Sequence, residues 1–308
     1  MTHENSSPVL IVGSMAFDDL ELPSGNAKDV VGGSATYASI AASLFAPVRA
    51  VAVVGDDFPD AVLKDLTSRG VDVSGVERAA GKTFRWAGRY SENLASRVTL
   101  DTQLNVFADF SPKLPARFKD SPFVLLGNIH PALQLDVLSQ IQNPRFVAAD
   151  TMNFWISGER KALGDVLKRI DTLVINDEEL RELAEIHNIK RAAAAVRALG
   201  PKRLVVKRGE YGSMLFDEHG VFFVPAFPLE DEVDPTGAGD SFAGGLLGCL
   251  ASSGSLDGQA LRRALMMASA TASFCVEGVG TKQLASISRE LVLSRLESLR
   301  SLVHLEVA

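Results

Sequence analysis

Short, continuously apolar runs alternate with helix-like segments along most of this 308-residue chain. Runs of this length without polar alternation are typical of strands that are buried on both faces of a parallel sheet. The strand-like runs are residues 8–13, 49–55, 123–127, 145–150, 172–176 and 203–207. Helical patterns lie between them, including 34–45 and 58–70, and residues 257–302 are almost wholly helical. The sequence therefore predicts an α/β fold whose mostly parallel central sheet is covered by helices on both faces.

Two half-polar stretches interrupt this alternation, at about residues 17–33 and 83–110. Their pattern is typical of antiparallel hairpins with one face in water. We expect the two stretches to meet as one small sheet, a lid over the end of the large sheet. Since no internal repeat or linker-like segment divides the chain, residues 1–308 are predicted to form a single domain with this lid embedded in it.

The charge and the apolar content exclude several classes of protein. The chain has 31 basic and 38 acidic residues and a net charge of −7, so we expect neither nucleic acid nor a membrane surface as a partner. No run approaches the length of a membrane span, and the first residues lack the basic and apolar regions of a signal peptide. Cys249 and Cys275 lie in apolar helical contexts, which is typical of buried thiols in a reducing compartment. The sequence therefore predicts a cytoplasmic protein.

The most informative motif is DPTGAGDSFAGGLLGCLA, at residues 234–251. Gly237, Ala238 and Gly239 form a flexible turn before an apolar helix, whose free N–H groups and dipole favour an anion at that point. Asp240 sits at the helix start, where a carboxylate could simply cap the helix. A carboxylate beside an anion site could also accept the hydroxyl proton during phosphoryl transfer. The motif alone leaves both interpretations open.

The start of this motif resembles the C-terminal signature of the ribokinase (PfkB) family of carbohydrate and nucleoside kinases. Further landmarks of that family appear in order at residues 13–20, 32–42, 176–180 and 205–216. The resemblance covers about residues 8–300. It implies a ribokinase-like three-layer fold with a β-sheet lid over the substrate. It also implies an enzyme that transfers the γ-phosphate of ATP to an alcohol group.

The resemblance assigns roles to individual residues. It makes Asp240 the general base and the backbone of Gly237, Ala238 and Gly239 the anion hole, with ATP and Mg²⁺ as cofactors. It places a monovalent cation, K⁺, near Asp234. The residues expected at the nucleotide and its magnesium are Asn176, Glu179, Lys207, Gly209 and Gly212, with Glu179 holding Mg²⁺ through water. Those expected at the acceptor are Asp18, Gly32, Gly33 and Asn128.

Some of these positions have ordinary structural alternatives. Asn176 and Glu179 would also suit a strand-end turn followed by an acid-rich first helical turn. Asn153 follows the strand-like run 145–150, at the usual ligand side of a parallel sheet, so it either reaches the acceptor or caps a turn.

The acceptor itself is left open between a sugar and a ribonucleoside. Ribokinases have asparagine where this chain has Ala16 and Tyr37, which argues against ribose. The predicted lid and the segment after it hold Phe84, Trp86, Tyr90 and Phe107, which could stack on a nucleobase or pack within the lid. The rival function is a catalytically idle regulator that binds a nucleotide or sugar on the same fold. Lid sheets in this family can pair into dimers, so a homodimer through the lid is a further expectation.

Overall fold

The apolar runs form one nine-stranded sheet in the computed structural model, which describes residues 6–304. The first residues of the segment predicted to lack a signal peptide, 1–5, and the end of the predicted domain, 305–308, lie outside the described residues. The strand order is β13-β12-β11-β10-β9-β8-β1-β4-β5, and neighbours from β11 to β5 run parallel. The strands are β1 (Val9–Val12), β4 (Val48–Val54), β5 (Val71–Arg78), β8 (Phe123–Leu126), β9 (Phe146–Asp150), β10 (Thr172–Asn176), β11 (Arg203–Lys207), β12 (Ser213–Asp217) and β13 (Gly220–Val224).

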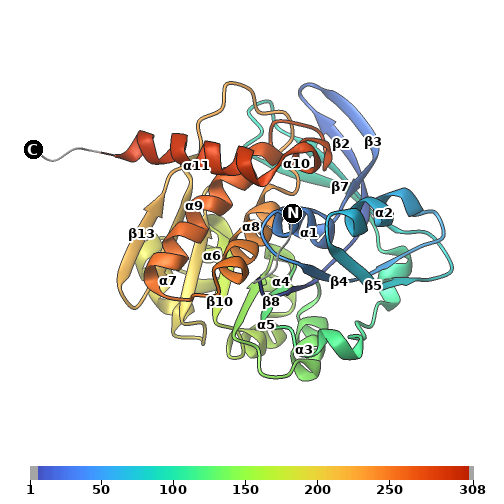
Figure 1. Ribbon diagram of the computed structural model, residues 1–308, viewed down its shortest axis with the longest axis horizontal. Coiled ribbons are helices and arrows are strands. Elements are labelled where there is room, and N and C mark those ends of the chain that lie inside the picture. The colour runs from blue at the N-terminus through green and yellow to red at the C-terminus, as the bar shows by residue number, and fades with distance from the viewer. Residues whose placement is uncertain (1–5, 305–308) are drawn as a thin grey trace, which may run out of the picture.

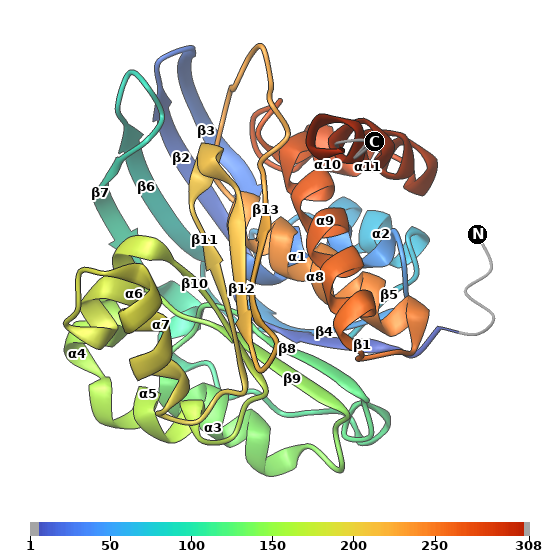
Figure 2. The same ribbon diagram turned by 90° about the vertical axis from the view of Figure 1, so that its left-hand side faces the viewer.

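Helices cover both faces of this sheet, as Figures 1 and 2 show. Each face has its own hydrophobic core, because the strands are apolar on both sides. One core contains side chains of α1 (Ser34–Ser43), α2 (Asp60–Ser68), α8 (Ala238–Ser253), α9 (Gly258–Cys275), α10 (Lys282–Ser286) and α11 (Arg289–Val303). The other contains side chains of α3 (Pro131–Gln140), α4 (Asn153–Gly158), α5 (Arg160–Leu167), α6 (Asp177–Ala184) and α7 (Ile189–Arg197). The three-layer α/β prediction is confirmed.

The two half-polar stretches form a second, four-stranded sheet in the order β3-β2-β6-β7. Its strands are β2 (Ala16–Leu22), β3 (Gly25–Gly32), β6 (Phe84–Tyr90) and β7 (Arg97–Gln103). Each stretch is an antiparallel hairpin, and the two hairpins join through a parallel pairing of β2 with β6. This lid sheet stands at one end of the large sheet in Figure 2. We use "lid" below for these four strands.

Three strands of the large sheet, β5, β12 and β13, were not predicted from the sequence. β5 is an edge strand with half-exposed residues, so it lacks the continuous apolar pattern of its neighbours. β12 and β13 form an antiparallel hairpin beyond β11, inside a segment that the sequence analysis treats as a nucleotide-binding turn. Short single-turn 3₁₀ helices occupy Asn105–Asp109, Ala116–Phe118 and Gly209–Tyr211.

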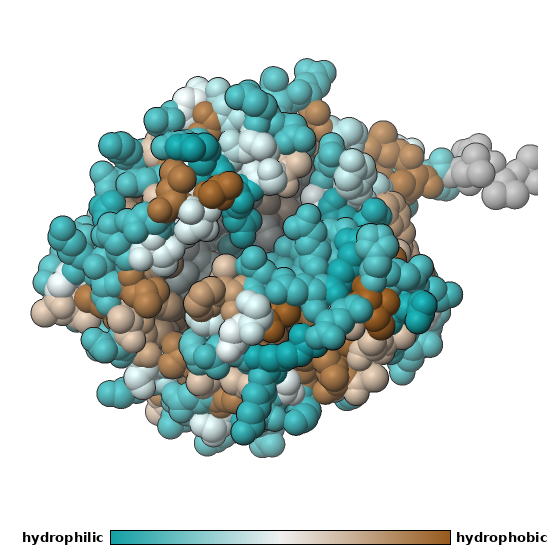
Figure 3. Space-filling model, turned by 180° about the vertical axis from the view of Figure 1, so that it is seen from behind, coloured by the Kyte–Doolittle hydropathy of each residue, from teal (hydrophilic) through white to brown (hydrophobic). Residues whose placement is uncertain are grey.

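Two further expectations concern the cysteines and the surface. Cys249 and Cys275 are both buried, as predicted. Within residues 6–304 no helix combines the length and the apolar character needed to cross a bilayer. Hydrophobic side chains on the face shown in Figure 3 are scattered among hydrophilic ones.

Candidate active site

The carboxyl ends of the parallel strands bring the chemically reactive side chains to one edge of the large sheet. Asp150 is the last residue of β9, Asn176 of β10 and Lys207 of β11. Because these strands are neighbours and parallel, their last residues meet at the same edge, where open α/β sheets bind ligands. Two pockets in the described part of the chain lie elsewhere, and none of the predicted site residues lines them.

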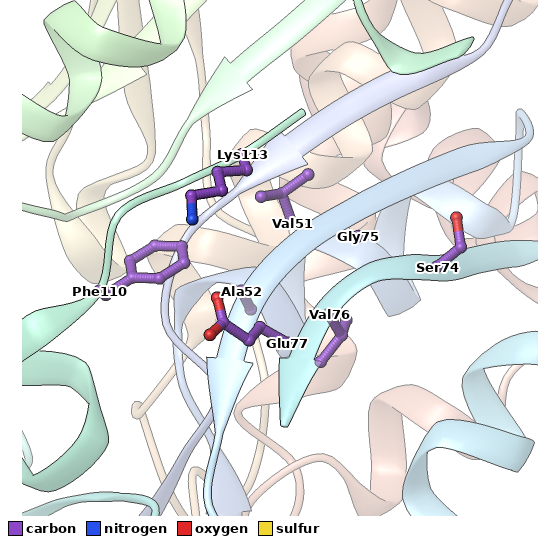
Figure 4. Close-up of a pocket in the computed structure, with 8 residues that line it drawn as sticks. All are labelled: Val51, Ala52, Ser74, Gly75, Val76, Glu77, Phe110 and Lys113. Carbon is purple, nitrogen blue, oxygen red and sulfur yellow. The ribbon is translucent and has the colours of Figure 1, made fainter. Parts of the chain in front are cut away.

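The smaller of these pockets has a volume of about 190 Å³ and lies beside β4 and β5. Figure 4 shows Lys113 and Phe110 on one side of it and Glu77 on the other. The larger has about 670 Å³ and lies among β13, α9 and α11. The candidate site is therefore defined by its chemistry at the strand ends.

The start of α8 is shaped by a glycine in the left-handed conformation. Gly237 is the N-cap residue with φ of +76°, and a Cβ there would collide with the ring of Tyr37. Within residues 235–239, which we call the anion turn, Gly237 therefore lies directly against that buried ring. The N–H of Ala238 donates to the carbonyl of Pro235 at 3.2 Å, so this amide closes the turn. The next first-turn amide, Gly239, has no intrahelical acceptor in a helix that begins at Ala238.

Asp240 is the third residue of α8, and its side chain forms no capping hydrogen bond. The capping interpretation left open by the sequence is therefore wrong, because Gly237 holds the N-cap position. Burial, with a smaller contribution from the negative charge of Asp150, raises the pKa of Asp240 to about 7. Lys207 and Arg97 act in the opposite direction. A carboxyl with this pKa exchanges a proton readily near neutral pH.

Lys207 is the cationic centre of the site. Its Nζ lies 3.1 Å from Oδ2 of Asp150 and would be 2.9 Å from a Cβ at Gly239, so the glycine lets the ammonium lie against the helix start. Burial lowers the pKa of Lys207, but the carboxylates of Asp150, Glu179 and Asp240 outweigh it and leave the pKa raised. The lysine therefore stays charged beside the anion turn.

Asn176 and Glu179 form a reciprocal capping box at the start of α6. The Glu179 N–H donates to Asn176 Oδ1 at 2.7 Å, and the Asn176 N–H donates to Glu179 Oε2 at 3.0 Å. Asn176 and Glu179 thus form the strand-end turn and first helical turn that the sequence analysis gives as the alternative to a role at the nucleotide. Burial, followed by the charge of Asp150, raises the pKa of Glu179 to about 7, although Lys207 opposes the rise. The Glu179 carboxyl is thus close enough to Lys207 and Asp150 for both charges to act on it.

Asp18 lies in the lid on β2 and is buried. A Cβ at Gly32 would collide with its carboxylate, so the glycine of β3 makes room for the acid. Burial, with smaller contributions from the charges of Asp234 and Asp240, raises the pKa of Asp18 to about 8. Gly33 has φ of +93° and is the N-cap of α1, so the Gly-Gly pair links the lid to the helix that carries Tyr37.

Asn128 and Asn153 are engaged with protein groups. Asn128 accepts from the Trp155 indole at 2.9 Å and donates to the Met152 sulfur at 3.2 Å. Asn153 is exposed, and its side chain accepts from the Phe154 N–H at 3.0 Å. The acceptor roles expected for these two amides therefore compete with existing hydrogen bonds.

The turn after β11 contains Gly209 and Gly212, both with positive φ. The Arg208 N–H donates to the Gly212 carbonyl at 2.8 Å and closes this turn. A Cβ at Gly209 would meet open space, whereas one at Gly212 would collide with the Val224 carbonyl on β13. Gly212 thus has a packing role, and Gly209 faces the open side.

Asp234 is fully buried just before the anion turn. Its Oδ1 accepts from the Thr236 N–H at 2.9 Å and its Oδ2 from the Gly280 N–H at 2.9 Å. Backbone N–H groups alone neutralise a buried carboxylate only in part, so the position fits a cation in contact with it. Across residues 6–304 no group of three or more acidic, histidine or cysteine side chains could hold a metal ion.

The lid aromatics pack against the protein. Phe107 stacks between Phe84 and Phe110, with ring centroids 5.4 Å from each. The Trp86 ring lies over Gly88, and its indole N–H donates to Thr99 Oγ1 at 3.3 Å. These side chains could stack on a nucleobase or pack within the lid, and packing accounts for their positions.

Two charged residues of the site were missed by sequence reasoning. Asp150 closes a strand-like run, and its place at a strand end was the available signal. Arg97 starts β7 directly opposite Tyr90, and its positive charge lowers the pKa of both Glu179 and Asp240. No local pattern marks Arg97, because its proximity to those acids depends on where the lid stands.

Comparisons with known proteins place the fold and the family of this chain. The profile of the pfkB family of carbohydrate kinases matches residues 9–287. A cytidine kinase of Thermococcus kodakarensis is 30% identical over 246 residues, covering 78% of this chain and 87% of that protein. A 2-dehydro-3-deoxygluconokinase of Thermoproteus tenax is 29% identical over 287 residues, covering 85% and 84%. An E. coli protein assigned as a ribokinase II, solved with ATP and Mg²⁺, superposes with a TM-score of 0.78 at 21% identity, covering 95% of this chain and 99% of that one.

Proposed function

This chain belongs to the pfkB family of carbohydrate kinases, and we propose that it transfers the γ-phosphate of ATP to a hydroxymethyl group of a ribonucleoside or sugar, with Asp240 as the general base. The observation that carries this proposal is the position of Asp240 in the first turn of α8, beside Lys207 and above the anion turn. A regulator that only binds a nucleotide or sugar would need no such base.

The step is a single in-line displacement. A bond forms between the acceptor oxygen and the γ-phosphorus while the bond from that phosphorus to the bridging oxygen of ADP breaks. The hydroxyl proton passes to a carboxylate oxygen of Asp240, whose pKa of about 7 suits a base near neutral pH. The anion turn and the Lys207 ammonium stabilise the negative charge on the transferring phosphoryl group.

Mg²⁺ would enter with the nucleotide and neutralise charge on the triphosphate. Asn176 and Glu179 would hold it through water, and the buried Glu179 carboxyl lies within range of the Lys207 charge. Arg97 would add a second positive charge from the lid side. Gly209 would allow the nucleotide to approach the turn after β11.

We favour a ribonucleoside as the acceptor. The Thermococcus relative is named a cytidine kinase, although the Thermoproteus relative acts, by its name, on a sugar acid. In its ionised form Asp18 would accept hydrogen bonds from two acceptor hydroxyls. With the lid aromatics packed, the exposed ring of Phe154, set edge-on against Trp155 at 4.9 Å, offers an aromatic surface for a base.

A series of neighbouring residues connects this surface with the acceptor end of the site. The Trp155 indole donates a hydrogen bond to Asn128. Gly127, which precedes Asn128 in sequence, packs against Ser34, since a Cβ at Gly127 would lie 2.9 Å from Ser34 Oγ. Ser34 in turn follows Gly33 in sequence. Because Gly32 contacts Asp18, a nucleoside whose ribose binds Asp18 could direct its base toward Phe154.

The test is ADP release with Mg·ATP and a panel of cytidine, adenosine, inosine, ribose, fructose and 2-dehydro-3-deoxygluconate. We expect turnover with at least one ribonucleoside. Asp18→Ala should raise the acceptor KM strongly and leave the KM for ATP nearly unchanged. Phe154→Ala should weaken the binding of nucleosides but not the binding of sugars. Binding of ATP without turnover of any acceptor would support the idle regulator instead. The cytoplasmic location and a homodimer through the lid stay predictions.

A further inference from the structure

The lid touches the anion turn through one side-chain hydrogen bond that crosses 146 positions of sequence. The hydroxyl of Tyr90, on β6, lies 2.9 Å from Oγ1 of Thr236, the residue before Gly237. Tyr90 is buried, and burial raises its pKa, so the phenol keeps its proton at neutral pH. The phenol can therefore act as the donor of a hydrogen bond between lid and turn.

Every polar group of Thr236 is engaged. Its N–H donates to Oδ1 of Asp234 at 2.9 Å, and its carbonyl accepts from the thiol of Cys275 at 3.4 Å. Those two partners belong to the body of the molecule. The Tyr90 bond is the contact of Thr236 that depends on where the lid stands.

The opposite side of the turn is fixed. The ring of Tyr37, which is 1% exposed, fills the space where a side chain at residue 237 would lie. Gly237 cannot move toward α1, since that space is occupied. The turn therefore contacts two tyrosines, Tyr37 in the body at Gly237 and Tyr90 in the lid at Thr236.

The same lid carries the acceptor's expected partner. β2, which bears Asp18, pairs with β6, and Asp18 stands opposite Trp86 in that pairing. A hydroxyl–hydroxyl bond tolerates little displacement, because its strength falls steeply outside about 2.5–3.0 Å. A shift of β6 by roughly an ångström would break the Tyr90–Thr236 bond.

We propose that Tyr90 is a positioning residue: its hydrogen bond to Thr236 sets the anion turn in its active geometry when the lid lies over the acceptor. The role rests on the proposed kinase function. It makes the lid a part of the phosphate site as well as a cover for the acceptor. Phosphoryl transfer thereby depends on lid placement even though Tyr90 touches neither ATP nor the acceptor.

The test is a double-mutant cycle with Tyr90→Phe, Thr236→Val and the double variant. Each single change removes one hydroxyl and keeps the shape of the side chain. We expect each to lower kcat roughly three- to tenfold, the worth of one hydrogen bond, with the KM for ATP unchanged. The double variant should be no slower than the slower single variant. Losses that multiply, or a wild-type kcat for Tyr90→Phe, would overturn the proposal.

Thr99→Val is the matched control, because it removes a lid hydroxyl that bonds Trp86 and does not reach the turn. It should leave kcat unchanged. A second measurement needs no turnover: amide hydrogen exchange across residues 236–243 should be several-fold faster in Tyr90→Phe than in the wild type or in Thr99→Val. Equal exchange in all three proteins would overturn the role of Tyr90 even if no acceptor is phosphorylated, whereas a missing activity with faster exchange would count against the kinase function alone.

Discussion

The ammonium of Lys207 lies 3.1 Å from the carboxylate of Asp150, across residues that are 57 positions apart in sequence. The pair forms where β9 and β11 end on either side of β10. It puts one cation among three carboxylates, those of Asp150, Glu179 and Asp240. The charge balance of this group sets the protonation of Asp240. Removing one negative charge or one positive charge from the group tests this relationship.

Replacing Asp150 with Asn should move the acid limb of kcat/KM to lower pH. The Asp150 charge raises the pKa of Asp240, so its removal lets Asp240 ionise at lower pH. The check is a pH–rate profile of Asp150→Asn against wild type. Asp120→Asn, which alters an exposed ion pair with Arg49, serves as the control and should not shift the limb. If the acid limb of Asp150→Asn stayed at the wild-type pH, the charge of Asp150 would not control the pKa of the general base.

Replacing Arg97 with Gln should move the same limb in the opposite direction. The positive charge of Arg97 lowers the pKa of Asp240, so losing it raises that pKa and leaves less of the base ionised below neutral pH. Arg89→Gln, in the same lid but paired with Glu21, is the matched control. A downward shift, or equal profiles for the two variants, would contradict the placement of Arg97 over the site.

Gly237→Ala should be far more damaging than Gly254→Ala, although the two glycines occupy opposite ends of α8. Both have left-handed backbone, with φ of +76° and +65°. A Cβ at Gly254 meets open space, so that change measures backbone strain alone, about 1–2 kcal/mol. A Cβ at Gly237 collides with the Tyr37 ring as well. Thermal melts and kcat of both variants provide the check, and equal effects would show that the ring does not define the turn.

The sequence predicts much of the fold because apolar strands report burial directly. It predicts a helix after the Gly-Ala-Gly turn, but not that Asp240 lies within its first turn, since the left-handed Gly237 at the N-cap shows where the helix begins. Asp150 and Arg97 could not be assigned, because their roles arise from pairings between strands distant in sequence. The lid aromatics show the same limit: Phe84 and Phe107 are visible as rings, but whether they face a ligand or each other is a tertiary property.

K⁺ should stabilise the protein as well as activate it. The buried Asp234 carboxylate has only backbone N–H donors, and a cation there would hold the anion turn through Thr236. Melting temperature and turnover should both be higher in K⁺ than in Na⁺ or in Tris buffer. Asp234→Asn should abolish the difference between the salts. Equal melting and equal rates in all three buffers would leave Asp234 as a structural turn residue.

The stability of the wild type relative to the Asp240→Asn variant should fall as pH rises. The folded-state pKa of Asp240 is raised to about 7, so its contribution to stability is present at low pH and is lost as pH rises through 7. Asn carries no charge, and the substitution removes no capping hydrogen bond. The variant should therefore melt at or above the wild-type temperature at pH 8.

The most direct measurement is the kcat of Asp240→Asn at pH 8 with saturating ATP and acceptor. Asn keeps the size of the side chain but cannot accept the hydroxyl proton, so we expect kcat to fall by about 10²–10⁴ while ATP and acceptor bind with similar affinity. A folded variant that retains more than roughly a third of the wild-type kcat, well outside the range for loss of a general base, would contradict the assignment of Asp240.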